Sequence, residues 1–112
     1  MAAELIGGPT LEGDKGEVRA DFRFKLKGLQ YDRLELSWRD PAVEEAGVEA
    51  GNSSLVVSQG KTELIAPVHV PESYFTGDRV LRFQLRDADE AGAPPMWQQD
   101  YRLGSGLKIE TT

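Results

Sequence analysis

The chain of 112 residues contains no cysteine and only one histidine, His69. The absence of cysteine excludes disulfide frameworks, thiol nucleophiles and cysteine-ligated zinc. No apolar run approaches the roughly 20 residues of a membrane-spanning helix. The net charge of −6 also repels phosphate backbones and anionic lipid surfaces. We therefore expect no nucleic-acid partner, no insertion into a membrane and no bound cofactor.

The start of the chain, residues 1–9, has neither the basic end nor the apolar core of a signal peptide. We expect a chain that stays where it is made, in the cytoplasm or on a virion, or a secreted domain whose leader has been removed. With 39% hydrophobic and 29% charged residues, the composition is that of a folded soluble chain. The length predicts a single domain over residues 1–112, with frayed ends at 1–3 and 110–112.

Apolar and charged residues alternate strictly from Glu17 to Lys27, which is the pattern of a strand with one buried face. The same alternation returns from Arg33 to Arg39 and from Arg79 to Asp87. We predict that the first two of these runs form an antiparallel pair on which the rest of the chain packs. The predicted core between two sheets consists of Phe22, Phe24, Leu36, Trp38, Leu81, Phe83 and Leu85.

The remaining segments predict shorter strands, and no helical period is sustained. The expected elements are an edge strand at Leu5-Ile6 with a turn after it, a loop over 42–53, strands at 55–59 and 62–70, a strand over 96–103 in a hairpin with 79–87, and a brief strand at 107–109. Pro67 places the 62–70 strand at a sheet edge or a bulge, because proline cannot donate to the ladder. The sequence therefore predicts an all-β fold, an immunoglobulin-like antiparallel β-sandwich of about seven or eight strands.

The run from Arg33 to Pro41 resembles the tryptophan strand of fibronectin type III modules, which ends in a similar Trp-x-x-Pro. Residues 77–92 are similar to the F strand and F-G loop of the same modules. The two departures are Val80, about where such a module keeps a buried tyrosine, and the long regular strand before Leu34. The resemblance covers about a quarter of the chain and implies an immunoglobulin-like sandwich, a fold that hosts many unrelated functions.

An acidic loop follows the 79–87 strand, and its candidate metal ligands are Asp87, Asp89 and Glu90. Together with Gly92 they match part of a calcium-binding loop. However, Ala91 replaces one ligand and Gln98 stands where a bidentate acid is required. We therefore predict no metal site, and a solvated hairpin loop instead.

Catalysis has little support, because no serine or acid stands beside His69 in a way that suggests a proton relay. We expect His69 to be a solvent-facing strand residue and the protein not to be an enzyme.

Two sets of residues are candidates for binding a partner. Tyr31, Tyr74 and Phe75 lie in predicted loops, where they either offer contact surface or plug the ends of the sandwich. Arg23 and Lys25 lie on the charged face of the 17–27 strand, where a locally basic surface would suit an acidic partner or a second copy of the chain.

The leading functional hypothesis is a non-catalytic interaction module that docks on a protein assembly, as an accessory protein of a virion or a cell surface would. The alternative is a carbohydrate-binding module, which would present Tyr31, Tyr74, Trp97 or Tyr101 as a sugar platform.

Overall fold

Eight β-strands and one short 3₁₀ helix build the protein, as seen in a computed structural model that describes residues 3–27, 33–42, 50–56 (backbone only), 62–90 and 92–112. The strands are β1 (Ala3–Asp14), β2 (Glu17–Leu26), β3 (Arg33–Arg39), β4 (Ala50–Val56), β5 (Glu63–Pro71), β6 (Arg79–Asp87), β7 (Trp97–Gly104) and β8 (Lys108–Thr111). The 3₁₀ helix η1 (Glu72–Tyr74) links β5 to β6. In these ranges no helix is long and apolar enough to cross a membrane.

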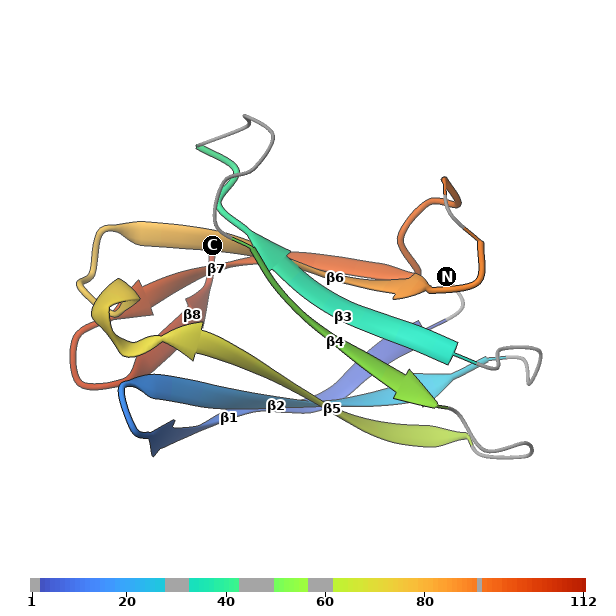
Figure 1. Ribbon diagram of the computed structural model, residues 1–112, viewed down its shortest axis with the longest axis horizontal. Coiled ribbons are helices and arrows are strands. Elements are labelled where there is room, and N and C mark those ends of the chain that lie inside the picture. The colour runs from blue at the N-terminus through green and yellow to red at the C-terminus, as the bar shows by residue number, and fades with distance from the viewer. Residues whose placement is uncertain (1–2, 28–32, 43–49, 57–61, 91) are drawn as a thin grey trace.

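The strands form two antiparallel sheets that lie face to face (Figure 1). Sheet A has the order β1-β2-β5, and sheet B has the order β4-β3-β6-β7-β8. In Figure 1, sheet A forms the lower layer, while β3 and β6 of sheet B lie in the layer above it. The predicted all-β fold with antiparallel sheets is therefore confirmed.

The predicted pairing of 17–27 with 33–39 is wrong. β2 pairs with β1 and β5, whereas β3 pairs with β4 and β6 in the other sheet. Each of these strands buries one apolar face. Two strands in the same sheet would have both faces covered by a common second layer, whereas two strands in different sheets cover each other across the core. The alternation that predicts each strand is the same in both cases, so it cannot distinguish the two.

The core lies between the sheets and is rich in aromatic side chains. All seven residues predicted for it are buried, with Trp38 the most exposed at 4%. The ring of Phe22 in β2 lies 5.2 Å from that of Phe83 in β6 and 5.7 Å from that of Trp97 in β7, measured between centroids. These contacts join sheet A to sheet B across the core. Because the alternate apolar residues of both sheets face this core, their parity along each strand is a reliable guide to burial.

Four further predictions about individual strands are settled by the structure. The hairpin of 79–87 with 96–103 is confirmed as β6 and β7, and the edge position expected from Pro67 is confirmed for β5. The brief strand at 107–109 is present as β8. The loop predicted over 42–53 is wrong at its end, because β4 already begins at Ala50.

The first strand also differs from prediction. We expected a strand at Leu5-Ile6 and then a turn, but β1 continues through Gly7, Gly8 and Pro9 to Asp14. Two shifts of register in its pairing with β2, between Leu5 and Gly7 and between Gly7 and Thr10, accommodate these residues as bulges.

Candidate functional site

The outward-facing side chains of β1, β2 and β5 form one surface, which we call the outer A face. Alternate residues of these strands point to the core, and the others point away from it. The outer A face comprises Glu4, Ile6, Thr10, Glu12 and Asp14 of β1, Glu17, Arg19, Asp21, Arg23 and Lys25 of β2, and Glu63, Ile65, Pro67 and His69 of β5. Lys27 continues this parity just beyond the end of β2 and is exposed.

The bulged part of β1 shapes this face because two of its residues have no side chain. Gly8 has a φ of 85°, a conformation that glycine adopts without penalty, and a Cβ at this position would lie 2.5 Å from the carbonyl oxygen of Asp21. At Gly7 a Cβ would make only ordinary contact, 3.7 Å from the Cβ of Arg23. The close approach of β1 to β2 at Asp21 therefore requires glycine at position 8.

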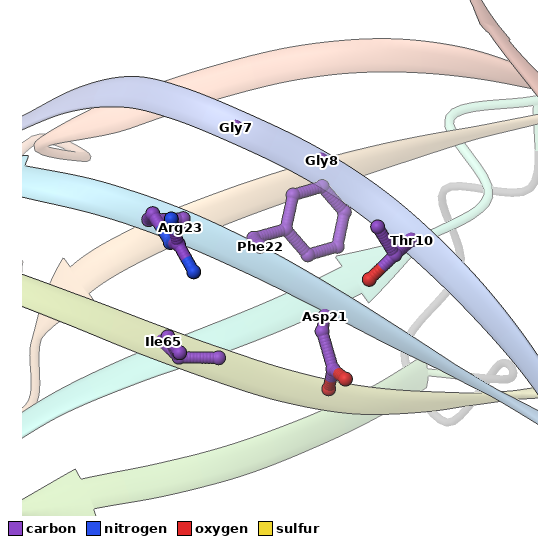
Figure 2. Close-up of a pocket in the computed structure, with 7 residues that line it drawn as sticks. All are labelled: Gly7, Gly8, Thr10, Asp21, Phe22, Arg23 and Ile65. Atoms are coloured by element: carbon purple, nitrogen blue, oxygen red, sulfur yellow. The ribbon is translucent and has the colours of Figure 1, made fainter.

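A hollow of about 380 Å³ lies beside these two glycines. Thr10, Asp21, Arg23 and Ile65 surround it, and the buried ring of Phe22 reaches it from below. Figure 2 shows this ring between the ribbons of β1 and β2, close to Gly8, with Arg23 and Ile65 on the neighbouring strands. The hollow thus combines a guanidinium, a carboxylate, a hydroxyl group and an aliphatic side chain.

Among the described residues, the charges of the outer A face are paired at one end and unpaired at the other. Arg19 donates a hydrogen bond of 2.6 Å from Nη2 to Oε2 of Glu12, and its Nε lies 3.4 Å from Oδ2 of Asp21. Within the part of the chain that the structure describes, the side chains of Arg23, Lys25 and Lys27 form neither a hydrogen bond nor an ion pair. Three cations in this end of the face are therefore available to an external acceptor.

Exposed aliphatic side chains lie directly beside these cations. Ile65 in β5 is 56% exposed and is the cross-strand partner of Arg23. Ile6 in β1 is 41% exposed and precedes Gly7, which pairs with Arg23 from the other side. The third large exposed aliphatic side chain in the described ranges, Leu107, lies in the hairpin between β7 and β8 of sheet B. Arg23 is thus flanked on both sides by exposed apolar surface, which is a common feature of protein-binding sites.

The outer face of sheet B differs, because its polar groups bind one another. Arg82 forms a two-point ion pair with Asp100, with distances of 2.9 and 3.2 Å. Arg86 donates to Oε1 of Gln84 and to the carbonyl oxygen of Ala93, and Gln84 donates to Gln98 at 2.6 Å. These bonds satisfy much of the polar surface of sheet B, so the outer A face is the better candidate for binding.

The expectation that Tyr74 and Phe75 are exposed is wrong, since they are only 5% and 8% exposed. Tyr74 ends η1 and packs its ring edge-on against Trp38, with the centroids 5.6 Å apart. The guanidinium of Arg79 covers the Tyr74 ring at 3.8 Å and lies 3.3 Å from Asp40. The loop turns these side chains inward because the apolar end of the core between β5 and β6 must be covered. They plug one end of the molecule, which was the second of the two roles considered for them.

Tyr31, the third loop aromatic, lies outside the described residues. His69 is exposed on the outer A face, as expected, and its Nε2 lies 3.8 Å from Oδ2 of Asp14.

In the acidic loop, Asp87 accepts a hydrogen bond of 3.0 Å from the backbone N–H of Asp89, while Asp89 and Glu90 are exposed. No three His, Cys, Asp or Glu side chains in the described ranges are grouped so that they could hold a metal ion.

Sequence reasoning found Arg23 and Lys25, which lie exposed on the outer A face, but it missed Ile6, Ile65 and the hollow. Ile65 has the parity of Pro67 and His69, so the alternation of 62–70 already placed this isoleucine on the solvent face. The signal that could have identified Ile65 is an apolar residue at a solvent-facing position of a strand. The hollow gave no comparable signal, because it depends on how β1 bulges around Gly7 and Gly8.

Tyr101 is a buried titratable group of the core, separate from this face. Its side chain is 2% exposed, and among the described residues its hydroxyl has no hydrogen-bond partner. Burial raises the pKa of Tyr101 above its ordinary value of 10.0. The ring itself is well packed, at 5.5 Å from Phe83 and 5.9 Å from Phe22.

We predict that Tyr101→Phe is at least as stable as the parent at pH 7, because it keeps the ring and removes a buried hydroxyl whose desolvation costs about 1–3 kcal/mol. A raised pKa in the folded state contributes stability below pH 10 that is lost as the pH rises above it. The advantage of the variant should therefore grow above pH 10. Urea denaturation at pH 7, 9 and 11 measures this, and two parallel pH profiles would contradict it.

Comparison of the chain with protein-family models, with curated protein sequences and with solved structures found no match.

Proposed function

We propose that this protein is a non-catalytic interaction module with an immunoglobulin-like arrangement of strands, and that it docks on a protein partner through the outer A face. The observation that carries the proposal is the juxtaposition of exposed Ile6 and Ile65 with Arg23, whose guanidinium has no partner among the described residues. Arginine is one of the residues most enriched in the binding hot spots of protein interfaces, and exposed apolar patches mark sites of protein interaction. A module of this kind suits an accessory protein of a virion, of another large particle or of a cell surface.

The strand order supports the immunoglobulin-like part of the proposal. Strands one, two and five form one sheet, and strands three, four, six and seven lie together in the other. Immunoglobulin-like sandwiches likewise place the first, second and fifth strands opposite the third, sixth and seventh. β8 extends this pattern as an additional edge strand beside β7.

Three of the four edge strands, β1, β5 and β8, favour docking through a face over the addition of a strand. β5 carries Pro67 and Pro71, which lack the N–H that a new strand would need. β1 is interrupted by bulges, and β8 has only four residues. A partner therefore gains more from the side chains of the outer A face than from these edges.

The carbohydrate alternative has lost its main support. Sugar platforms use exposed aromatic rings, and every aromatic side chain in the described ranges is buried, including Tyr74, Trp97 and Tyr101.

The proposal is tested with the native partner captured by cross-linking from the source of the protein and then purified. We expect Arg23→Glu combined with Lys25→Glu to weaken binding at least about tenfold, the size of effect expected for an arginine hot spot. The control is Arg39→Glu combined with Arg102→Glu, which reverses two exposed charges of sheet B.

Both double variants should melt close to the parent, because surface substitutions of this kind change stability by only about 0.5 kcal/mol. Binding that is lost in the sheet B control and kept in the outer A face variant would refute the proposed docking face.

A further inference from the structure

We infer that a second copy of this chain is a partner of the outer A face, so that the protein forms a symmetric dimer with sheet A packed against sheet A. This inference rests on the proposed function, because it uses the same docking face. It starts from the uneven distribution of charge along the strands, because the pairing register shows which charged residues lie at each end of the face.

The two ends of the outer A face carry opposite charge. The end that holds the β1-β2 turn has four carboxylates, of Glu12, Asp14, Glu17 and Asp21, against two cations, the guanidinium of Arg19 and the ammonium of Lys15 in the turn. The other end has the cations of Arg23, Lys25 and Lys27 against the carboxylates of Glu4 and Glu63. A face that is acidic at one end and basic at the other is complementary to itself when one copy is reversed.

A two-fold axis between the two faces, running across the strands near Phe22, produces this reversal. It brings each strand opposite its own copy in the reverse direction, so that every contact between two residues occurs twice, as in any two-fold interface. Asp21 and Arg23 flank Phe22 in β2, so Arg23 of each copy meets Asp21 of the other. The unpaired guanidinium of Arg23 thereby gains a carboxylate partner twice in one interface.

The centre of the face also suits close contact between two copies. Gly7 and Gly8 leave β1 without side chains beside the hollow, and exposed Ile65 stands next to it on the far side of Arg23. Burying Ile65 and Ile6 of both copies removes four exposed aliphatic side chains from water, which favours association. In this arrangement Ile6 and Ile65 lie on the two outer strands of the sheet, on either side of the charged pair that Arg23 and Asp21 form on the central strand β2.

The size of the face predicts a weak dimer. Strands about 4.8 Å apart with a rise of about 3.3 Å per residue give the three strands a flat footprint of about 450 Å². Projecting side chains raise the accessible area toward the lower limit of about 600 Å² per partner for specific interfaces. The net charge of −6 on each copy opposes association at long range. We therefore expect a dissociation constant between about 1 μM and 1 mM, with a monomer that is folded on its own.

Sedimentation equilibrium of the whole chain from about 10 μM to 1 mM tests the inference, and a monomer–dimer equilibrium in this range is the expected result. Arg23→Asp and Asp21→Arg should each raise the dissociation constant at least about tenfold, because each places like charges opposite one another. The double variant Asp21→Arg with Arg23→Asp should return it to within about threefold of the parent, since the pair is restored with its signs exchanged.

Ile65→Ser and Leu107→Ser form a matched pair, because each removes one exposed aliphatic side chain but only Ile65 lies on the outer A face. Ile65→Ser should weaken the dimer, and Leu107→Ser should not.

A parent chain that stays monomeric up to 1 mM would overturn the dimer, as would a charge exchange that fails to restore it. If the chain is monomeric and the Arg23→Glu and Lys25→Glu variant still loses the native partner, the dimer falls and the proposed docking function stands. If the dimer behaves as expected but that variant binds the native partner normally, the dimer stands and the proposed function falls.

Discussion

Phe22→Ala should lower the free energy of unfolding by about 3–5 kcal/mol, the range measured when a fully buried aromatic side chain is deleted. Phe22 is 0% exposed, and its ring packs against those of Phe24, Phe83, Trp97 and Tyr101. Because these rings come from both sheets, the alanine variant loses contacts within sheet A and across the core at once. A domain of this size has a total stability of about 5–15 kcal/mol, so the loss is a large fraction of it.

Guanidinium denaturation followed by far-ultraviolet circular dichroism measures this loss. Ile65→Ala is the control in the same sheet, and it should change stability by no more than about 0.5 kcal/mol because Ile65 is largely exposed. A loss below about 1 kcal/mol for Phe22→Ala would show that the aromatic cluster does not hold the two sheets together.

The sequence alone predicts which side of each regular strand is buried, because the alternation of apolar and polar residues is repeated along the whole strand. In β2 the apolar residues from Val18 to Leu26 are all buried, and the charged residues between them are exposed or half-buried. The same holds in β3 and at Leu81, Phe83 and Leu85 of β6. Burial in these strands depends on local parity alone, and for that reason the core is predictable.

Sheet membership is not predictable in the same way. β2 and β3 follow each other in the chain and have the same alternation, yet they belong to different sheets. Which strand lies beside which is decided by the turns and by long-range packing, for example of Phe22 against Phe83, and neither leaves a mark in the alternation. The charged residues of β3, Arg33, Glu35 and Arg39, which the predicted pairing would have set beside those of β2, consequently belong to sheet B.

The candidate site shows the same difference between features set by local parity and features set by long-range packing. Parity predicted the exposed positions of Arg23 and Lys25, and Ile65, which the prediction missed, has the same outward parity within β5. In contrast, Tyr74 and Phe75 lie in a connection where parity has no meaning, and they turn inward to cover the end of the core. The hollow beside Gly8 arises from register shifts between β1 and β2, which are set by the pairing of two strands and not by either strand alone.

The bulged part of β1 is therefore the most specific feature of the outer A face, and Gly8 is the residue on which it depends. Alanine at position 8 would have to keep a φ of 85°, and its Cβ would lie 2.5 Å from the carbonyl oxygen of Asp21. A left-handed conformation costs a non-glycine residue about 1–3 kcal/mol, and forcing an atom into a closed contact typically costs a similar amount. The clash is with backbone, which cannot move aside as a flexible side chain can.

We expect Gly8→Ala to lower the free energy of unfolding by about 2–5 kcal/mol and to push β1 away from β2 near Asp21. Gly13→Ala is the matched control in the same strand, because a Cβ there meets nothing within 4 Å and its φ is not positive. The control should be neutral or slightly stabilising, since alanine restricts the unfolded chain more than glycine does. Denaturation measures the stability of both variants, and amide hydrogen exchange at Asp21 and its neighbours in β2 reports the local opening. Equal stability of the two variants would mean that β1 can leave this conformation without cost, and the hollow would then not be a fixed part of the face.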